Sequence, residues 1–264
     1  MLIIAERINA TRKRIGQAFA ARDAAFIQEE ARRQVEAGAD YLDLNAALDP
    51  QQERDLMAWA VQTVRETTAV PLAVDTASPE AARAGLELLP KGSALLNSIS
   101  AERERLRTML PLAVEFETHL VVLAMDDSGL PDSCEARWKA LETVFAATDE
   151  AGIPRKRIFV DPLVRPVATG PEQAGQCLQM IREIAERGEG AGTIVGLSNI
   201  SYGLPQRRHL NRVFLALAAG AGLSAAILDP TEPGMTATVL AAACVTGDDA
   251  FCMNYITAQR EGRL

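Results

Sequence analysis

The sequence predicts an α/β fold, a single (β/α)8 TIM barrel that spans residues 1–264 as one domain, and three observations support it. Short apolar runs alternate with charged, helix-periodic segments about eight times along the chain, which is typical of parallel strands joined by helical crossovers. The length of 264 residues suits such a barrel, which needs roughly 250 residues. No stretch rich in Pro, Gly or Ser separates two halves as a linker would. A doubly wound open sheet is the alternative arrangement of the same elements.

Eight segments have the length and composition of buried parallel strands. In chain order they are Leu2–Ile8, Tyr41–Asn45, Leu72–Thr76, Ala94–Ser98, Leu120–Met125, Ile158–Val164, Thr193–Ser198 and Ala225–Asp229. Each is a short run dominated by apolar or β-branched residues. The continuous apolar stretch Val121-Val122-Leu123-Ala124 indicates burial on both faces of the sheet, as in parallel sheets covered by helices.

Charged segments with helical periodicity follow these strands. They are Ala24–Ala37, Gln52–Glu66, Pro79–Leu88, Ala101–Glu115, Cys134–Ala151, Pro171–Arg187, Arg207–Ala219 and Met235–Val245. In the first of them, Phe26, Ala31 and Val35 fall near one face while Glu29 and Arg33 lie elsewhere. An apolar stripe of this kind is expected of a helix that packs on a sheet and exposes its other side.

Charge and hydropathy exclude several classes of function. The net charge of −8 argues against a nucleic-acid partner, because binding to a phosphate backbone relies on Lys and Arg. No apolar run reaches the roughly 20 residues that a membrane-spanning helix needs. The strand-like start Leu2-Ile3-Ile4 has no feature of a secretory signal. We therefore expect a cytoplasmic protein that binds neither nucleic acid nor membrane.

Cysteine and histidine are too few and too scattered for a metal site. The four cysteines are Cys134, Cys177, Cys244 and Cys252, and none forms a Cys-x-x-Cys pair. The only histidines are His119 and His209, interpreted as a strand-edge and a helix-surface residue. Because zinc sites draw on close sets of these residues, we expect no metal and reduced thiols.

Polar side chains stand at the end of nearly every predicted strand. In chain order the ring contains Glu6, Asn9, Asp43, Asn45, Asp75, Asn97, Asp126, Asp127, Asp161, Asn199 and Asp229. Active-site groups of an α/β barrel lie at the carboxyl ends of its strands. Helix capping explains a single Asp or Asn at such a position, but it explains poorly a ring made almost wholly of these two residues.

The composition of this ring suits a flat heterocycle edged with hydrogen-bond donors and acceptors. A carboxylate can accept two parallel N–H bonds from an amino-pyrimidinone edge, and an Asn amide can both donate and accept. These properties describe a pterin as the ligand. No His or Cys nucleophile stands in the ring, so we expect catalysis by positioning and polar stabilisation and not by covalent attack.

Several short motifs, in order and at strand ends, carry a resemblance to a known family over essentially the whole chain. They are Glu6-Arg7-Ile8-Asn9, Leu42-Asp43-Leu44-Asn45, Val74-Asp75-Thr76, Leu96-Asn97-Ser98, Asp161-Pro162-Leu163 and the most specific one, Gly196-Leu197-Ser198-Asn199-Ile200-Ser201-Tyr202-Gly203-Leu204-Pro205. The chain resembles the pterin-binding methyltransferases. These include the methyltetrahydrofolate:corrinoid methyltransferases, the folate domain of cobalamin-dependent methionine synthase and, more distantly, dihydropteroate synthase.

The resemblance implies roles for individual residues. Asp75, Asn97 and Asp161 would bind the pterin ring, and Asn199 would lie near its methyl-bearing N5 atom. Further residues would line the cavity or contact the rest of the folate: Gly196, Ser198, Glu6, Asn9, Asp43, Asn45 and Asp126, with Arg207 toward the aminobenzoate-glutamate tail. The resemblance also implies a homodimer.

The implied activity is methyl transfer between N5 of tetrahydrofolate and the cobalt of a corrinoid. The catalytic residues would be Asn199, which donates a hydrogen bond to N5, and Asp75, which would belong to a polar network that relays the proton. Asp126 is the other candidate member of that network, and Asp75 is preferred because the family motif covers it. The chain lacks the Asp-x-His-x-x-Gly string of cobalamin-carrying domains. The corrinoid must therefore arrive on another protein.

Two other classes of function remain open at this point. One is a dihydropteroate-synthase-like enzyme, which would need basic residues at several strand ends for a diphosphate. The other is a non-catalytic folate-binding subunit. The original methyl donor is also open, since an O-demethylase, a methylamine or betaine demethylation system and an acetyl-CoA route are all compatible with the sequence.

Overall fold

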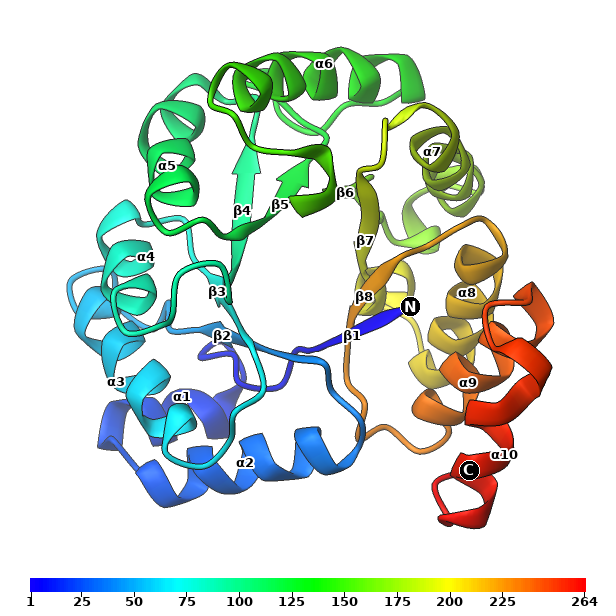
Figure 1. Ribbon diagram of the computed structural model, residues 1–264, viewed down its shortest axis with the longest axis horizontal. Helices are drawn as coiled ribbons and strands as arrows, with labels where there is room; N and C mark the ends of the chain where they lie inside the picture. The colour runs from blue at the N-terminus through cyan, green and yellow to red at the C-terminus, as the bar shows by residue number, and fades with distance from the viewer.

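A computed structural model describes residues 1–264 and contains a closed barrel of eight parallel strands (Figure 1). Each strand pairs with its neighbour in sequence, and β8 returns to pair with β1. The strands are β1 Leu2–Ala5, β2 Tyr41–Asn45, β3 Leu72–Asp75, β4 Leu95–Ser100, β5 His119–Leu123, β6 Ile158–Asp161, β7 Gly192–Gly196 and β8 Ala225–Leu228. The predicted fold class is confirmed, and the open-sheet alternative is wrong.

Helices surround the barrel as an outer ring (Figure 1). They are α1 Lys13–Ala21, α2 Ala24–Glu36, α3 Glu53–Arg65, α4 Pro79–Leu86, α5 Arg103–Glu115, α6 Cys134–Glu150, α7 Gln173–Arg187, α8 Arg207–Gly220, α9 Met235–Thr246 and α10 Met253–Arg260. Short 3-10 helices occur at η1 Arg155–Arg157, η2 Val167–Thr169, η3 Leu197–Ser201 and η4 Ala250–Cys252. No helix is both long and apolar enough to cross a membrane.

Several predicted boundaries and two omitted helices need correction. Strands β1, β6 and β7 end earlier than predicted, at Ala5, Asp161 and Gly196, because the chain leaves the hydrogen-bonded ladder there. After Asp161 the next residue is Pro162, which has no N–H group to donate to a ladder. Residues after Gly196 form η3 and do not continue the strand. Helix α1 was not predicted, since its nine residues are too few to be stable without packing. Helix α10 was missed for the same reason.

Helix α1 is held by tertiary contacts. Its Phe19 is completely buried and meets the ring of Trp59 on α3 edge-on, with ring centroids 5.5 Å apart. Gly16 is required because a Cβ at this position would lie 2.5 Å from the carbonyl oxygen of Ala10. The helix therefore packs closely over the loop that follows β1.

Alternation along each strand divides the core into two regions. Residues that point outward pack against the helices in a large cluster, which includes Leu42, Leu44, Val74, Leu96 and Val122. Residues that point inward form a separate apolar layer inside the barrel: Ile4, Ala73, Leu95, Val121, Ile194 and Ala225. Because side chains on a strand alternate between faces, the inward positions two residues further along form the next layer toward the carboxyl ends.

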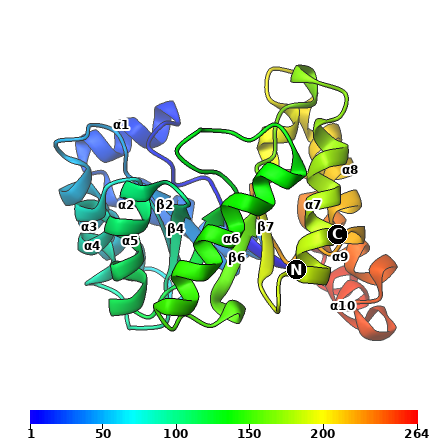
Figure 2. The same ribbon diagram turned by 90° about the horizontal axis from the view of Figure 1, so that it is seen from above.

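The carboxyl ends of the strands open on one side of the barrel. Figure 2 shows the β5–α6 loop in green and the segments around η2 and η3 in yellow-green and yellow rising on the side opposite the N-terminus. Helix α6 begins at this level with Ser133 as its cap, whose hydroxyl accepts a hydrogen bond from the Ala136 amide at 3.1 Å. The mouth of the barrel is therefore framed by the loops that follow the strands, as in α/β-barrel enzymes.

Candidate functional site

A polar layer lies directly above the apolar layer inside the barrel, which forms the floor of the site. Its members occupy inward positions that follow the floor residues at the carboxyl ends of the strands: Glu6, Asp43, Asn45, Asp75, Asn97, Asp161 and Asp229, with Gly196 leaving a gap without a side chain. The structure thus brings together most of the ring predicted from the sequence. The reason is that inward positions recur every two residues on every strand.

Two carboxylates from β2 and β3 lie side by side in this layer. Asp43 is 4% exposed, and its Oδ1 atom accepts a hydrogen bond from Asn97 Nδ2 at 3.3 Å. Asp75 accepts one from Asn45 Nδ2 at 2.9 Å. No Lys, Arg or His forms an ion pair with either of them. Asp43 is therefore a buried acid and Asp75 a half-buried one, and only side-chain amides donate hydrogen bonds to them.

The surroundings favour the protonated forms of these two acids. Burial, and after it the negative charge of Asp75, raise the pKa of Asp43 well above its usual value. Burial also raises the pKa of Asp75, against the lowering effects of the Asn45 hydrogen bond and of the charge of Arg105. Adjacent acids that disfavour each other's charge can hold a proton between them. This side of the mouth can therefore accept or release a proton.

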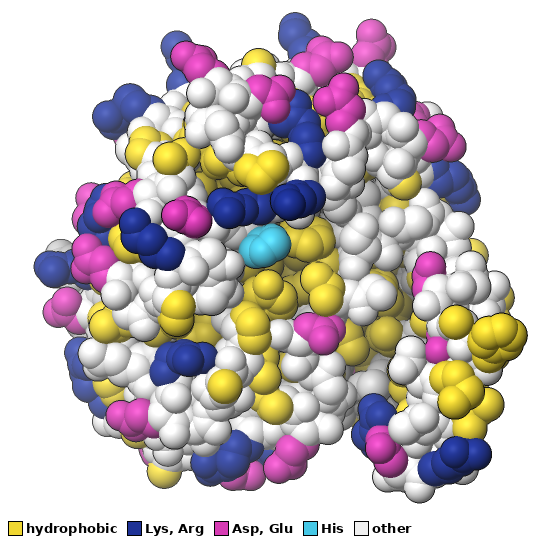
Figure 3. Space-filling model, in the orientation of Figure 1, with side chains coloured by type: hydrophobic (Ala, Val, Ile, Leu, Met, Phe, Trp, Pro, Cys, Tyr) yellow, Lys and Arg dark blue, Asp and Glu magenta, His cyan; other side chains and the backbone are white.

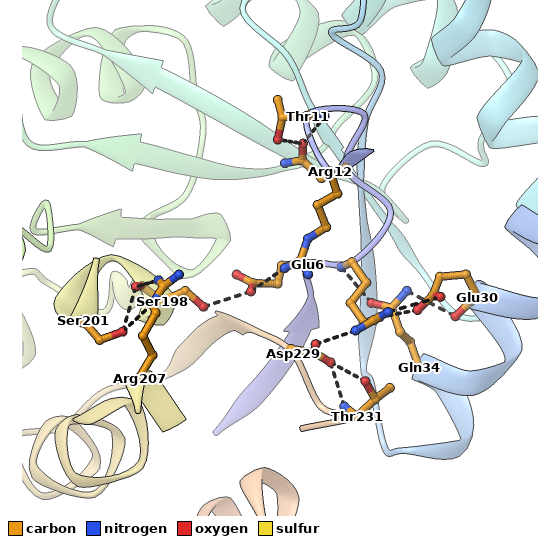
Figure 4. A network of polar contacts seen from close by, with 12 residues as sticks. Glu6, Thr11, Arg12, Glu30, Gln34, Ser198, Ser201, Arg207, Asp229 and Thr231 are labelled. Carbon is orange, nitrogen blue, oxygen red and sulfur yellow. Dashed lines mark hydrogen bonds and ion pairs between the residues drawn. The ribbon is translucent and has the colours of Figure 1, made fainter. Parts of the chain in front are cut away.

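Glu6 stands at the end of β1 in a network of its own (Figure 4). Its Oε1 atom accepts hydrogen bonds from Ser198 Oγ and from Arg12 Nη2, each at 2.9 Å. Figure 4 shows Ser198 and Arg12 approaching the carboxylate from different sides. Burial raises the pKa of Glu6, although Arg12 and the Ser198 hydroxyl act in the opposite direction. Glu6 thus links the first strand to η3, across 192 residues of sequence.

A second network closes the barrel where β8 meets β1. Arg7 forms ion pairs with Glu30 on α2 and, at 2.9 Å, with Asp229 after β8. The Asp229 carboxylate also accepts hydrogen bonds from the amide and hydroxyl of Thr231. Although burial alone would raise the pKa of Asp229, these partners lower it. Asp229 therefore remains charged, and its carboxylate is already bonded to other groups of the protein.

Asp161 ends β6 with one oxygen engaged. Its Oδ1 atom accepts a hydrogen bond from the Leu163 amide at 2.8 Å, and no side chain is bonded to the other oxygen. Burial raises the pKa of this carboxyl to about 6, although the Leu163 amide and the charge of Arg137 oppose the change. A half-buried carboxylate with a free oxygen is suited to accept N–H donors from a ligand.

Asn199 lies in η3 immediately beyond β7. Its side chain is exposed at the mouth and makes no hydrogen bond within the protein. A Cβ at position 196 would lie 3.0 Å from Asn199 Nδ2, so Gly196 gives this amide the room that it occupies. Arg207 braces the same segment by donating to Ser201 Oγ at 3.0 Å and to the carbonyl oxygen of Ser198. The free amide is therefore held by a supported turn.

Two predicted site residues use their side chains locally. Asp126 lies three residues beyond the end of β5, and its carboxylate accepts hydrogen bonds from the hydroxyl and amide of Ser128, which lower its pKa. Asn9 likewise accepts hydrogen bonds from the amide and hydroxyl of Thr11. Both residues shape loops at the mouth. A ligand contact by either of them stays a prediction.

Sequence reasoning missed two arginines near the site. Arg12 contacts Glu6 directly, and the charge of Arg105 on α5 acts on Asp75. Both follow a strand end within the first helical turn or the loop before it, where a basic residue can reach the mouth. Their position just after a strand end was the feature of the sequence that could have revealed these two arginines. No group of three or more His, Cys, Asp or Glu side chains is arranged to hold a metal ion.

Comparison with known families agrees with this geometry. The sequence pattern of the pterin-binding enzymes matches residues 5–229, from the end of β1 to the residue after β8. The methylcorrinoid:tetrahydrofolate methyltransferase of Eubacterium limosum is 31% identical over 266 residues, which cover 100% of this chain and 98% of that protein. The methionine synthase of Mycobacterium tuberculosis is 30% identical over 246 residues, or 88% of this chain and 20% of that longer enzyme.

Solved structures show the same fold at lower sequence identity. Dihydropteroate synthase from Xanthomonas albilineans in complex with 7,8-dihydropteroate superposes with a TM-score of 0.70 at 23% identity, over 94% of both chains. The Yersinia pestis enzyme with a pterine-sulfa conjugate superposes with a TM-score of 0.64 at 19% identity, over 95% of this chain and 93% of that chain. These likenesses concern the barrel architecture.

Proposed function

This chain belongs to the pterin-binding enzyme family, and from that premise we propose that it transfers a methyl group between N5 of tetrahydrofolate and the cobalt of a corrinoid held by a separate protein. The observation that carries the proposal is a layer of buried and half-buried carboxylates and amides above an apolar floor, with one free amide at its edge. The full-length similarity to a methylcorrinoid:tetrahydrofolate methyltransferase supports the same reaction.

The pterin ring is proposed to lie over the apolar floor with its polar edge toward β3, β4 and β6. Asp161 has a free oxygen, and Asp75 accepts only the Asn45 amide, so both can accept N–H groups of the amino-pyrimidinone. Asn97 donates to Asp43 through Nδ2 and keeps its own oxygen for a ligand N–H. This arrangement uses the acceptors that the protein leaves unoccupied.

Asn199 is proposed to act on N5. Its amide has no partner inside the protein, and η3 places it on the other side of the mouth from the acids of β2 and β3. A hydrogen bond from this amide would strengthen as negative charge develops on N5, so it would stabilise the transition state more than the bound folate. An amide cannot supply a net proton, which must come from another group.

The proton is proposed to pass through Asp75 and not through Asp126. When methyltetrahydrofolate is the donor, the N5–methyl bond breaks, the electron pair stays on nitrogen and N5 gains a proton. In the opposite direction N5 forms the bond to the methyl group and loses its proton. Asp75 is half-buried next to a second acid and can serve both directions, whereas Asp126 is held as a carboxylate by Ser128.

The physiological direction is proposed to run from the methylated corrinoid to tetrahydrofolate. The name of the Eubacterium limosum relative describes that direction. A chain of this kind would complete a demethylation system in which another methyltransferase first methylates the corrinoid from a methoxyaromatic, methylamine or betaine donor. The corrinoid supplies the cobalt that carries the methyl group.

The corrinoid protein is proposed to dock at the mouth of the barrel. Three large apolar side chains are exposed on loops that follow the strands there: Leu48 after β2, Leu130 after β5 and Tyr202 after η3, at 42%, 57% and 68% exposure. A flat macrocycle with apolar faces must come close to N5 for its cobalt to exchange the methyl group. Exposed apolar groups on this rim provide a contact surface for it.

A homodimer is proposed to form through the C-terminal helices. Figure 3 shows apolar side chains gathered at the right-hand edge, over the region of α9, η4 and α10. The exposed members include Val245 at 89% and Phe251 at 92% exposure, with Val213 and Leu217 on the neighbouring α8. A cluster of exposed apolar side chains is typical of an association surface. Sedimentation at micromolar concentration should give twice the 28.4 kDa of one chain, and a monomer would contradict the proposal.

The synthase alternative is weaker because Arg7 and Arg12, two basic residues at the mouth, already have acidic partners. A diphosphate would need free cations, whereas Arg7 pairs with Glu30 and Asp229, and Arg12 pairs with Glu6. The structural likeness to dihydropteroate synthases shows a shared fold only.

The decisive experiment combines the purified chain, tetrahydrofolate and a corrinoid protein that carries a methyl group on cobalt. We expect loss of the methylcobalt absorbance and formation of methyltetrahydrofolate in equal amounts, with Asp75→Asn as a matched, slower variant. Folate binding without turnover against several corrinoid proteins would favour the non-catalytic subunit. Formation of dihydropteroate from a pterin diphosphate and aminobenzoate would favour the synthase.

A further inference from the structure

Glu53 is a buried acid that the proposed reaction leaves unused. It lies in the first turn of α3 and is 8% exposed. It belongs to none of the ion pairs of the structure, and its one side-chain partner is the hydroxyl of Thr76, which donates a hydrogen bond to its Oε1 atom. The amino end of a helix stabilises a negative charge, which explains how this side chain is tolerated without a cation.

Thr76 directly follows Asp75 in the chain. Its amide donates to the carbonyl oxygen of Asn97 at 2.9 Å, and its hydroxyl accepts a hydrogen bond from the Ser78 amide at 3.0 Å. The single proton of that hydroxyl needs an acceptor of its own, and Glu53 provides it. Because Thr76 is 4% exposed, solvent is poorly placed to substitute for Glu53.

The bond to Glu53 acts from behind the strand. Asp75 points into the barrel, so Thr76, one residue later, points outward to α3. Asp75 lies opposite Asn97 in the register of β3 and β4, and the Thr76 amide extends this pairing one residue beyond the end of β3. Inside the mouth, Asn45 is the one side chain bonded to Asp75. The outward bond is therefore a second restraint, applied to the backbone that carries Asp75.

We propose that Glu53 is a positioning residue, which holds Thr76 from behind β3 and thereby keeps the Asp75 carboxylate directed into the mouth. The inference rests on the proposed function for the reaction in which Asp75 takes part. It assigns to Glu53 no contact with folate and no share in the proton transfer. Precise placement matters because a shift of about 1 Å in a reacting group can lower a rate by about 10²-fold.

Four substitutions separate this bond from other effects. Glu53→Ala removes the acceptor, whereas Glu53→Gln keeps a side-chain oxygen that can accept the Thr76 hydroxyl. Thr76→Val removes the donor and keeps the branched shape of the side chain. Asp55→Ala is the matched control, because Asp55 is an exposed acid in the same first turn of α3 and makes no side-chain hydrogen bond.

The first test needs neither folate nor a corrinoid. Hydrogen exchange of the Thr76 amide, followed by NMR, reports on its bond to Asn97. We expect exchange to be about tenfold faster in Glu53→Ala, in line with the loss of one hydrogen bond, and close to the wild type in Glu53→Gln and Asp55→Ala. Unchanged exchange in Glu53→Ala would overturn the proposal. Equal acceleration at the core amides of every strand would also overturn it, since Glu53 would then support only the fold as a whole.

The second test measures methyl transfer from a methylated corrinoid protein to saturating tetrahydrofolate. Glu53→Ala and Thr76→Val should each slow the transfer by about tenfold, and the double variant should be no slower than either. Glu53→Gln should restore most of the rate. In an Asp75→Asn background, Glu53→Ala should cause no further loss. A full additional loss in that background would mean that Glu53 does not act through Asp75, and the proposal would fail.

The two tests also separate this inference from the function on which it rests. Wild-type protein that transfers no methyl group, while exchange at Thr76 still depends on Glu53, would contradict the proposed function and leave the anchoring of this backbone supported. Wild-type transfer together with exchange and rate that Glu53→Ala does not change would overturn the inference and leave the function supported. If Glu53→Ala does not fold, Thr76→Val allows both measurements at the amide of residue 76.

Discussion

At the seam between β8 and β1, the charged side chains of Glu6, Arg7 and Asp229 each have a partner of opposite charge, whereas the acids of β2, β3 and β6 have none. Glu6 pairs with Arg12, and Arg7 pairs with Glu30 and Asp229. Across the barrel, Asp43 and Asp75 are bonded to amides, and Asp161 to a backbone N–H group. On the seam side the charged groups form ion pairs with one another, and these pairs hold the barrel closed. The opposite side leaves acceptors free for a ligand.

The largest effect is expected at Asn199, the free amide on the seam side. Asn199→Ala should lower the methyl-transfer rate by about 10²–10³ and change tetrahydrofolate affinity much less, because its hydrogen bond strengthens only as charge develops on N5. Stopped-flow absorbance of the corrinoid gives the rate, and calorimetry gives the affinity.

Equal losses of rate and affinity would make Asn199 an ordinary binding contact. The matched control is Ser198→Ala, which removes a partner of Glu6 from the same turn. We expect this control to change the rate less than Asn199→Ala does.

The next largest effect is expected at Glu30, and it tests the structural role of the seam. Glu30 is 3% exposed and pairs with Arg7, so Glu30→Ala should lower the free energy of unfolding by about 3 kcal/mol. Urea unfolding measures this change. The control is Glu29→Ala on the same helix, whose exposed pair with Arg32 should contribute less than about 1 kcal/mol. Similar values for the two variants would mean that the seam network does not hold the barrel closed.

A smaller effect of opposite sign is expected at Asp161. Its pKa in the folded protein, about 6, lies above the roughly 3.9 of an unfolded aspartate, so the folded state binds the proton more tightly. The stability contributed by this proton is present at low pH and is lost as the pH rises through about 6. Asp161→Asn should therefore be more stable than the wild type by about 2 kcal/mol at pH 8.

The same variant should bind tetrahydrofolate more weakly by about 1.5–3 kcal/mol, since a charge-assisted hydrogen bond is lost. Unfolding curves at pH 4 and pH 8 and calorimetry at pH 8 measure the two effects. Loss of stability at pH 8, or unchanged affinity, would contradict the assignment of Asp161 to the ligand side of the mouth.

The smallest effect is expected at Asp126. Its carboxylate is held by Ser128 within the β5–α6 loop. Asp126→Asn should therefore change the transfer rate by less than about threefold, within the range of a surface substitution of about 0.5 kcal/mol. A large loss of rate would place the proton path through this loop and not through Asp75.

The barrel and its polar ring were predictable because both depend on local periodicity. Ala73 and Asp75 lie two residues apart on β3 and therefore point the same way, into the barrel, and the same relation joins Leu95 to Asn97 on β4. Helix α1 was not predictable, since it depends on the burial of Phe19 against Trp59. Asn199 was predicted as a site residue at the end of the seventh strand, but the 3-10 helix η3 that holds it was missed.

The sequence alone determined which residue types stand at each strand end, because alternation and strand order follow from the chain itself. Only the tertiary structure decided which of those groups are satisfied and which are free. Glu6 meets Ser198 from 192 positions away, and Arg137, a charged residue on a helix, is buried. Closing the barrel brings distant side chains together, and the resulting burial sets whether each charge is paired within the protein or left for a ligand.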